Sequence, residues 1–377
     1  MSELVSVAKI KIFGIGGCGN NSLKSMANLN VDNVEMIFVN TDKQALASFE
    51  EHKTLNIGGK QGIGAGAKPE VGYNQANKSR EEIANLVKDT DLVVITAGMG
   101  GGTGTGASPV FAEEAKKAGA LVVAVVTTPF NMEGKMRQRV AEEGIETLRK
   151  YVDSYIVISN QKLLNVFGNL AHKAAFEKSN KVLQQVIRTL VDVIAKPCQI
   201  NVDFADLKTI LQNKGEAVVG IGKANGEKRA EKAMINAISS PILQSKINGA
   251  KNALVTIFAS AQVTLQEFDI AIKTLEANVG NDINIILGVS TNENESSEAL
   301  GDLYISVIAT DLADPSLQTL EESKSNFTDE TRSENIKTNS ESFSKESSYG
   351  YYSEKQNSEK DDIFSNPKYT IDHLKNK

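Results

Sequence analysis

The sequence of 377 residues contains little cysteine and proline and no tryptophan. Its two cysteines, Cys18 and Cys198, are far apart and provide no disulfide framework, which indicates a reducing compartment. Seven prolines, 41% hydrophobic residues and 23% charged residues exclude a collagen-like chain and a long coiled coil. At roughly 150 residues per domain, the length predicts two to three domains, or two domains plus an unfolded segment.

Long hydrophobic runs are also absent. A helix that crosses a bilayer needs about 20 apolar residues, and the longest candidate here, residues 120–126, is far shorter. The first residues, MSELVSVAKIKIF, have neither the charged start nor the apolar stretch of a signal peptide. We therefore expect a soluble, cytoplasmic protein with no direct membrane insertion.

The chain has no excess of positive charge: 47 acidic residues outnumber 41 basic ones, which gives a formal net charge of -6. Because binding to a nucleic-acid backbone requires a basic face, this charge argues against nucleic acid as the main partner. A single nucleotide needs only a few oriented backbone N–H groups, so the charge does not exclude it. Glycine is distributed unevenly, with 18 of the 29 glycines in the first 134 residues.

The first half of the chain predicts an α/β fold. Up to about residue 172, short apolar runs alternate with helical patterns and glycine turns, which is typical of a parallel sheet covered by helices. The expected strands are residues 8–13, 34–39, 92–96, 121–126 and 155–158. The expected helices are residues 22–28, 80–87 and 109–118.

The second half divides into three parts. A helical pattern at residues 173–198, clearest over 174–195, predicts a long helix between two domains. Residues 199–314 predict a smaller α/β domain, with strands at 217–222, 253–259, 283–289 and 303–309. Residues 315–377 contain 12 serines, 12 acidic and 9 basic residues, but only 6 leucines, isoleucines or valines. Such a segment buries too little apolar surface to fold, so we expect a disordered linker and a short terminal peptide.

A first glycine loop follows the expected strand 8–13. Residues 14–21 (GIGGCGNN) match G-x-G-x-x-G, and an acidic residue, Asp42, lies 23 positions after Gly19. This pattern fits a Rossmann dinucleotide site, in which a pyrophosphate binds at a helix N-terminus. The alternative is a tight turn packed against the sheet, because a single motif of this kind is weak support.

A second and richer glycine loop follows the expected strand 92–96. In residues 97–108 (AGMGGGTGTGAS), the glycines allow the backbone to approach a phosphate closely, and Thr103 and Thr105 add hydroxyl donors. No glycine here is followed by Lys and then Ser or Thr, so this is not a Walker A loop. The sequence therefore predicts a phosphate site that is neither a P-loop nor a standard Rossmann loop.

Taken together, these motifs resemble the FtsZ/tubulin family of GTPases. The resemblance covers about residues 8–312 and rests on GGGTGTG at 100–106, the first glycine loop, and the segments 40–42, 62–72, 128–137 and 201–206. It implies a Rossmann-like GTPase domain (residues 1–172), a central helix (173–198) and a smaller α/β domain (199–314). A disordered tail (315–377) completes this plan.

The resemblance also implies a GTP site. The phosphates would bind Gly17, Cys18, Gly19, Asn20 and Asn21 of the first loop, and Gly102, Thr103, Gly104, Thr105 and Gly106 of the second. Residues 65–68 would lie near the γ-phosphate. The family commonly has Asn where this chain has Lys68, which would bring a cation close to the phosphates.

Two further residue pairs match nucleotide-binding positions of the family. Glu133 and Arg137 match the pair that contacts the ribose, although their spacing also suits an exposed salt bridge. Phe176 and Asn180 match the residues that stack on and hydrogen-bond to guanine. Phe176 taken alone would more often be a core residue.

The candidate catalytic residues are Asn201, Asp203 and Asp206, which form N-x-D-x-x-D at an expected helix start. By residue type alone, the two aspartates are a helix cap. The resemblance implies instead that this loop enters the nucleotide site of the next subunit, where Asp206 activates the water, Asp203 assists and Asn201 orients. Mg²⁺ would be held largely by phosphate oxygens and water, without a protein metal site.

The implied activity is GTP-dependent self-assembly into a head-to-tail homopolymer that forms the bacterial cell-division ring, with hydrolysis coupled to polymer turnover. The terminal peptide would bind membrane-tethering or regulatory proteins at the division site, although Ile371 and Leu374 are its only aliphatic residues over 369–377. Cys198 and Ser159 replace a usual Gly and Pro and put the turnover rate in question. The alternatives are an NAD-dependent oxidoreductase and a nucleotide-binding structural protein with little turnover.

Overall fold

The structure is a computed structural model, and all the residues that it describes belong to one compact unit. The described residues are 8–24, 26, 33–167, 172–195, 200, 202–240, 245, 247–260, 263–280, 282–292 and 302–312. Asn201, Cys198 and the expected linker and terminal peptide at 315–377 lie outside them. Within the described part, no helix has both the length and the apolar character needed to span a bilayer.

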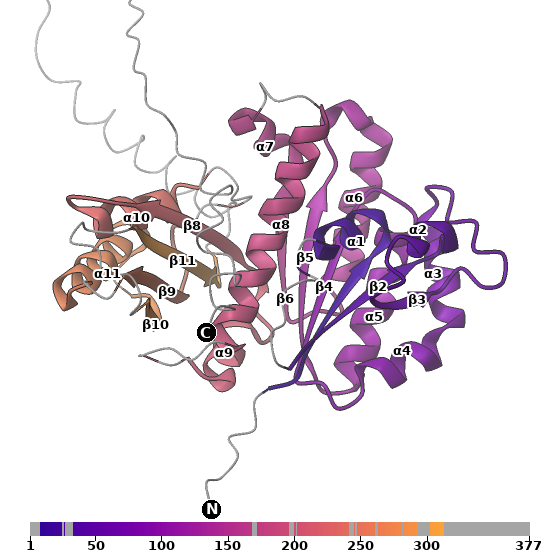
Figure 1. Cartoon of the computed structure of the whole chain (residues 1–377), viewed down its shortest axis with the longest axis horizontal. Coiled ribbons are helices and arrows are strands. Elements are labelled where there is room, and N and C mark those ends of the chain that lie inside the picture. The colour runs from indigo at the N-terminus through magenta and orange to yellow at the C-terminus, as the bar shows by residue number, and fades with distance from the viewer. Residues whose placement is uncertain are drawn as a thin grey trace, which may run out of the picture. The chain divides into compact units, whose positions relative to one another are not determined.

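The first half of the chain forms a parallel sheet, as the sequence predicts, and a short strand from after helix α9 (Phe204–Leu211) extends it to seven strands, all parallel. Its strand order is β3-β2-β1-β4-β5-β6-β7 (Figure 1). The strands are β1 (Ile10–Ile15), β2 (Val34–Asn40), β3 (Lys53–Asn56), β4 (Leu92–Gly98), β5 (Leu121–Thr128), β6 (Ser154–Ser159) and β7 (Gly215–Glu216). The sequence did not predict β3 and β7, which are the two short edge strands.

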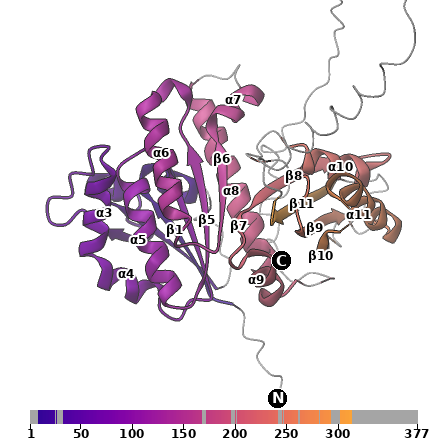
Figure 2. The same ribbon diagram turned by 180° about the vertical axis from the view of Figure 1, so that it is seen from behind.

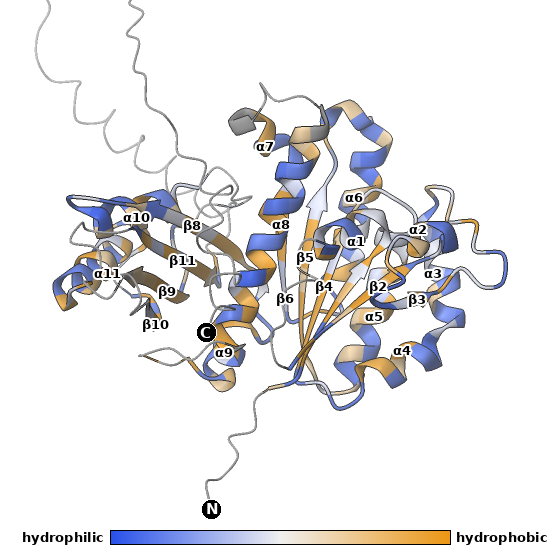
Figure 3. Ribbon diagram, viewed as in Figure 1, coloured by the Kyte–Doolittle hydropathy of each residue, from blue (hydrophilic) through white to orange (hydrophobic). Residues whose placement is uncertain are grey.

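Burial on both faces explains why the central strands could be predicted. All of β4 except its last residue is buried, and so is all of β5 except Thr128. Strands covered on both faces read as continuous apolar runs, and in Figure 3 the strands at the centre of this sheet carry hydrophobic colour along most of their length. The core between the sheet and its outer helices includes Phe13 and Phe111, whose ring centroids are 5.3 Å apart.

Helices cover both faces of the sheet. Helices α3, α4, α5 and α6 lie over the face seen in Figure 2, whereas α1 and α8 lie over the opposite face (Figure 1). The bounds are α1 (Gly16–Lys24), α2 (Lys43–Ala47), α3 (Pro69–Lys78), α4 (Arg80–Val87), α5 (Thr103–Lys117), η1 (Asn131–Glu133), α6 (Lys135–Leu148), α7 (Asn160–Phe167) and α8 (His172–Ala195).

Two helices begin earlier than the sequence predicts. Helix α1 begins at Gly16 rather than Ser22, and α5 begins at Thr103 rather than Pro109, which lies inside the helix. Glycine and proline count against helix in sequence reasoning, because glycine costs about 1 kcal/mol relative to alanine in a helix interior and proline more. The first turns of both helices are therefore built from residues expected to be loop.

Close backbone contact between α3 and the N-terminal part of α5 explains one glycine in each helix. A Cβ atom added at Gly106 would lie 2.0 Å from the carbonyl oxygen of Pro69, and one added at Gly72 would lie 2.3 Å from that of Gly102. Neither distance can be reached without displacing backbone. Helices α3 and α5 thus pack at the separation that only glycine allows.

A second sheet and its helices form the C-terminal part. Helix α9 (Phe204–Leu211) precedes a four-stranded sheet of order β10-β9-β11-β8, in which β11 is antiparallel to both neighbours. The strands are β8 (Val218–Ala224), β9 (Asn252–Ser260), β10 (Asn284–Asn292) and β11 (Leu303–Thr310), and the helices are α10 (Arg229–Ile238) and α11 (Leu265–Val279). The sequence predicts all four strands to within three residues at each end.

A buried ion pair joins α10 to α11. Arg229 is 1% exposed, and its Nε and Nη2 atoms donate to the two carboxylate oxygens of Glu267 at 2.6 and 3.1 Å. The hydrogen bonds from the guanidinium hold the pKa of Glu267 below its usual value. Because a buried charge left alone is costly, the pair fixes how the two helix N-termini meet.

We predict that Gly106→Ala destabilises the fold, because the added methyl group forces α3 away from α5. Overpacking of this kind costs about 1–3 kcal/mol of unfolding free energy. Urea unfolding without nucleotide, followed by circular dichroism, measures the change. Gly101→Ala is the matched control, since a Cβ atom there meets nothing within 4 Å. Equal stabilities for the two variants would contradict the packing argument.

Candidate nucleotide site

The strand order places two glycine loops at one point of the sheet. Strand β1 pairs with β2 on one side and with β4 on the other, so the chain direction of the crossovers reverses between β1 and β4. The carboxyl ends of these two strands run into the first turns of α1 and the loop before α5. Crevices at such switch points are where parallel α/β sheets bind ligands.

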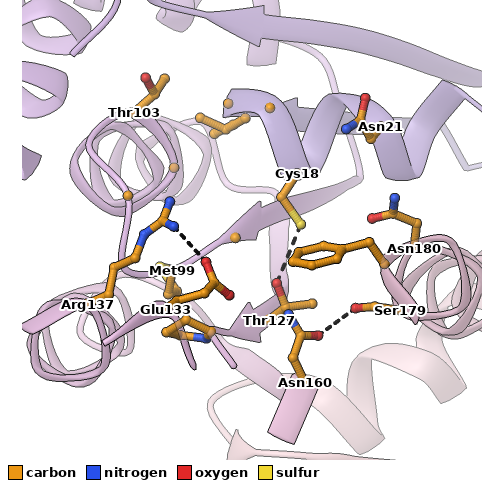
Figure 4. Close-up of a pocket in the computed structure, with 18 of the residues that line it drawn as sticks. Cys18, Asn21, Met99, Thr103, Thr127, Glu133, Arg137, Asn160, Ser179 and Asn180 are labelled. Carbon is orange, nitrogen blue, oxygen red and sulfur yellow. Dashed lines mark hydrogen bonds and ion pairs between the residues drawn. The ribbon is translucent and has the colours of Figure 1, made fainter. Parts of the chain in front are cut away.

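A pocket of about 370 Å³ lies at this point. Its volume falls in the usual range for small-molecule sites, roughly 300–1,000 Å³. Its walls come from both glycine loops, the ends of β4 and β5, the segment 129–137, and helices α7 and α8. Figure 4 shows the labelled side chains around it.

Backbone groups dominate the wall formed by the two glycine loops. The first-turn N–H groups of a helix have no partner within the helix, so the N-termini of α1 and α5 present free donors and the positive ends of two helix dipoles. Neither first turn contains an acidic residue. A Cβ atom added at Gly16 would lie 3.1 Å from the amide nitrogen of Gly104, so the two N-termini are in direct contact. This arrangement suits a chain of phosphates.

The predicted phosphate-binding residues divide into two groups. Those that line the pocket are Gly17, Cys18, Asn21, Gly102, Thr103 and Gly104. Those that do not line it, and instead lie behind the wall, are Gly19, Asn20, Thr105 and Gly106. Gly19 is needed for packing, since an added Cβ atom would lie 2.3 Å from the carbonyl oxygen of Thr96. Thr105 shapes the second loop by accepting a hydrogen bond from the Gly100 amide at 2.9 Å.

Asn20 has an unusual environment. It is 1% exposed, and neither its side-chain oxygen nor its side-chain nitrogen has a hydrogen-bond partner among the described residues. The hydroxyl of Thr96, also fully buried, has no partner either. Buried polar groups without partners are rare because each costs about 1–3 kcal/mol. Their concentration beside the first loop is consistent with a ligand or water in this region.

A pair of hydroxyl groups connects the second loop to the end of β2. The Oγ1 atoms of Thr41 and Thr103 are 2.6 Å apart. Thr41 is fully buried and precedes Asp42, which caps α2 by accepting from the amides of Gln44 and Ala45. Asp42 therefore serves as a helix cap here and does not line the pocket.

Glu133 and Arg137 line the pocket as a pair. Arg137 Nη1 donates to Glu133 Oε2 at 2.6 Å, and the other carboxylate oxygen accepts from the Phe130 amide at 2.9 Å. Both oxygens of Glu133 are thus occupied. The salt bridge that their spacing suits is present, and it positions both side chains at the pocket wall (Figure 4).

An aromatic ring and several amides form the other side of the pocket. Phe176 and Asn180 of α8 both line it, and the Phe176 ring meets that of Phe130 edge-on with centroids 4.8 Å apart. Asn160, at the start of α7, accepts a hydrogen bond from Ser179 at 2.5 Å. A flat ring next to amide donors and acceptors suits a planar base with polar edges.

Sequence reasoning missed several lining residues. Among them, Asn160, Ser179 and Thr127 approach the pocket from three different elements. Ser179 lies between the two predicted residues Phe176 and Asn180, so a helical projection of α8 could have indicated it. Thr127 lies near the end of the apolar strand β5, where sequence alone does not distinguish a pocket wall from core.

The two aspartates of the candidate catalytic loop lie outside this pocket. Asp203 is the N-cap of α9 and accepts from the Asp206 amide at 2.8 Å, and Asp206 accepts from the Asp203 amide at 3.1 Å. This reciprocal capping box uses one oxygen of each carboxylate. Asp203 is exposed and Asp206 is half-buried, so a second oxygen of each is left for another contact. Asn201 lies outside the described residues.

Cys18 lies in the middle of the pocket wall, with its Sγ atom 3.5 Å from the hydroxyl of Thr127. Burial raises the pKa of this thiol, against the opposing effect of the hydrogen bond to Thr127, and the nearby Glu133 carboxylate raises it further. The neutral thiol therefore persists to higher pH than in an exposed cysteine.

We predict that Cys18 reacts slowly with iodoacetamide, because the thiolate is the reactive form and a raised pKa reduces its fraction. The rate at pH 8 should be lower than that of glutathione and should still increase above pH 9. Peptide mass spectrometry resolves the Cys18 peptide. A bound nucleotide should slow the reaction further, and equal rates with and without GTP would contradict the location of the site.

Comparisons with known proteins agree with this geometry. The model of the Tubulin/FtsZ family, GTPase domain, matches residues 9–168, and that of the FtsZ family, C-terminal domain, matches residues 215–313. "Cell division protein FtsZ" of Mycoplasmopsis pulmonis is 45% identical over 314 residues, which cover 83% of this chain and 80% of that protein. "Cell division protein FtsZ 1" of Methanocaldococcus jannaschii is 42% identical over 289 residues, or 76% and 79% of the two chains.

Solved structures show the same fold. The "FtsZ dimer, empty" of M. jannaschii superposes with a TM-score of 0.75 at 40% identity, over 80% of this chain and 88% of that one. CetZ2 from Haloferax volcanii, at 19% identity, shares the fold with a TM-score of 0.67 over 86% of this chain and 99% of that one. The comparisons give no support to an NAD-dependent oxidoreductase. The sheet, the glycine-lined pocket and these matches together show that the chain belongs to the Tubulin/FtsZ family of GTPases.

Proposed function

We propose that the chain assembles head to tail into protofilaments during bacterial cell division and hydrolyses GTP at the contact between neighbouring subunits. One observation carries this proposal. The only carboxylate among the described residues that line the pocket is Glu133, and both its oxygens are already bonded. Glu133 is held by a salt bridge and a backbone amide, which makes it a poor base, whereas the capping box of α9 holds two carboxylates, each with an oxygen outside the cap. We therefore assign the activation of water to the capping box of a neighbouring subunit.

The nucleotide would lie with its phosphates on the N-termini of α1 and α5. Its ribose would lie beside Glu133 and Arg137, and its guanine beside Phe176 and Asn180. This orientation matches the donors of the glycine loops to the phosphate oxygens and the aromatic ring to the base. The match to the GTPase domain of the Tubulin/FtsZ family supports the nucleotide, and the similarity to the FtsZ dimer supports the self-assembly.

The donor set of the pocket also suits Mg²⁺ bound through the nucleotide. Among the described residues, no group of three His, Cys, Asp or Glu side chains could hold a metal ion. Mg²⁺ commonly keeps several waters and binds substrate phosphates, so such a group is not needed. When bound, the ion would neutralise charge on the phosphates. Thr103, whose hydroxyl bonds to Thr41, is placed to orient phosphate oxygens in the same region.

In the assembled site, Asp206 of one subunit would accept the proton of the attacking water, and Asp203 would orient that water. Asn201 would assist as a polar group. The helix N-terminus beneath them restrains both aspartates, because each also caps the other's amide. The carboxylates thus reach the neighbour's nucleotide from a fixed position, which avoids the cost of ordering a loop during reaction.

We further propose the division into a GTP-binding domain (1–172), a central helix (173–198), an activating domain (199–314) and a linker with a terminal peptide (315–377). The terminal peptide would bind division proteins that tether the polymer to the inner face of the membrane.

A structural protein that binds GTP with little turnover is the second candidate, because Ser159 and Cys198 differ from the usual family residues. Turnover measurements separate these two candidates.

We predict that GTP turnover and light scattering both show a threshold in protein concentration. Below the threshold, subunits meet too seldom to build the shared site, so the rate per molecule should be near zero. Phosphate release measured across a range of protein concentrations, with scattering in parallel, tests this. A turnover per molecule that does not depend on concentration would contradict the shared site.

We predict that Asp206→Asn retains GTP binding and the fold but lowers turnover by at least about 100-fold, the usual loss when a general base is removed. Asparagine still accepts the hydrogen bond from the Asp203 amide, so α9 stays capped. Asp206→Ala is the paired variant, because it removes the cap as well as the charge. If Asp206→Asn hydrolyses GTP normally while Asp206→Ala unfolds, the aspartate is only a cap.

A further inference from the structure

Two buried hydroxyl groups hold the C-terminal end of α9. The last four carbonyl groups of a helix have no partner within it, so a buried helix end needs partners from elsewhere. The Oγ1 atom of Thr310 donates to the carbonyl oxygen of Ile210 at 2.8 Å, and the Oγ atom of Ser154 donates to that of Leu211 at 2.6 Å. Thr310 and Ser154 are both 0% exposed. Each bond therefore joins α9 to a buried residue that is distant in the sequence.

The two hydroxyl groups come from different sheets. Ser154 is the first residue of β6 in the parallel sheet, and Thr310 is the last residue of β11 in the four-stranded sheet. Lys214, just beyond α9, makes the same connection: its amide donates to the carbonyl oxygen of Asp153 at 2.9 Å, and its ammonium group lies 2.6 Å from the carboxylate of Asp311. The end of α9 is thus attached to both sheets.

The segment that leads into α9 is attached to the four-stranded sheet as well. Ile200 pairs with Val289 of β10 through two backbone hydrogen bonds of 3.3 and 3.2 Å. A Cβ atom added at Gly288 would lie 2.9 Å from the Cγ2 atom of Val202, so Val202 packs closely on the same strand. The capping box at 203–206 follows directly. The two aspartates therefore stand at the start of a helix about 12 Å long whose far end is attached to both sheets.

These attachments decide where the aspartates lie. The capping bonds between Asp203 and Asp206 are made within α9, so they do not fix the position of α9 relative to the sheets. A general base must lie within about 2.6–3.2 Å of the atom whose proton it takes. A misplacement of about 1 Å can lower a rate about 100-fold. A helix of two turns that loses one attachment can shift as a whole by such a distance.

We propose that Ser154 and Thr310 are positioning residues for GTP hydrolysis, and that they act by fixing α9 and the aspartates at its start. This inference rests on the proposed role of Asp206 at the nucleotide of a neighbouring subunit. Neither hydroxyl group belongs to a residue that lines the nucleotide pocket. Their loss therefore lowers turnover within the polymer and leaves the affinity of a single subunit for nucleotide unchanged.

Thr310→Val tests this, because valine keeps the shape of threonine and removes the donor. Turnover per polymerised subunit is the slope of phosphate release against protein concentration above the light-scattering threshold. It should decrease at least about tenfold, while the affinity for GDP, measured without scattering, should change less than about twofold. Thr310→Ser keeps the hydroxyl group and should keep the turnover. Ser154→Ala should act like Thr310→Val, and it carries the same comparison if Thr310→Val fails to fold.

Thr256→Val is the matched control. Thr256 is buried in β9, and its hydroxyl group bonds to that of Ser306 in β11, so the bond lies within the four-stranded sheet. The control removes a buried hydroxyl bond from the same sheet without removing a donor to α9. It should lower the urea midpoint of unfolding about as much as Thr310→Val does. Its turnover per polymerised subunit should stay within about twofold of the wild type on the reasoning above.

The Asp206→Asn background separates positioning from general loosening of the fold. Interacting residues give non-additive effects in a double-mutant cycle. Once the carboxylate is gone, its position no longer matters, so adding Thr310→Val or Ser154→Ala to Asp206→Asn should lower the residual turnover no further. A purely structural effect would instead lower turnover by the same factor in both backgrounds.

Three outcomes would overturn the inference: wild-type turnover in either hydroxyl variant, an equal loss in Thr256→Val, or the same further loss in the Asp206→Asn background. The Asp206→Asn variant alone shows which idea has failed. If it loses turnover while the hydroxyl variants keep theirs, the role of Asp206 stands and Ser154 and Thr310 do not position it. If Asp206→Asn hydrolyses GTP like the wild type, the proposed role of Asp206 is itself wrong.

Discussion

The structure depends on the direct contact of backbone with backbone around the second glycine loop. The N-terminus of α5 meets α1 at Gly16 and Gly104, and it meets α3 at Gly106 and Pro69. A methyl group added at Gly106 would displace the backbone of α3, and one added at Gly16 would press closely on the amide nitrogen of Gly104. Because no side chain intervenes, the N-termini of α1 and α5 lie together at the pocket, and the positive ends of their helix dipoles add there. The other walls of the pocket, formed by the Glu133–Arg137 pair and by Phe176 and Asn180, surround this region of positive potential.

The central strands could be predicted from the sequence because they are buried on both faces. The sequences of β4 and β5 consist almost wholly of apolar residues, which predicts a buried strand at each place. The short edge strands β3 and β7 were not predicted because two to four residues carry no period. Helix α6 was not predicted either, since only Ala141, Gly144 and Leu148 are buried in a helix otherwise rich in charge.

The sequence predicted the two glycine loops of the candidate site, but it did not predict where their helices begin or all of the residues from α7 and α8. The glycine loops stand out because glycine is costly where no ligand needs it. The predicted helix starts were wrong for the same reason, since propensity counts against helices whose first turns are Gly-Gly-Cys-Gly in α1 and Thr-Gly-Thr-Gly in α5. A helical projection of α8 could have indicated Ser179, but Asn160 could not be predicted, because its hydrogen bond with Ser179 between α7 and α8 appears only when the chain is folded. The aspartates of α9 show a cap in the structure, and the same two residues carry the proposed chemistry.

The glycine contact between α3 and α5 also has a mechanical consequence. Side chains can change rotamer and absorb a small displacement, whereas two backbones in contact cannot, because protein interiors are dense and barely compressible. A shift of the α5 N-terminus by a fraction of an ångström must therefore carry the start of α3 with it. A small displacement of the α5 N-terminus at the pocket is therefore passed on to α3, and so to the outer face of the sheet that α3 covers.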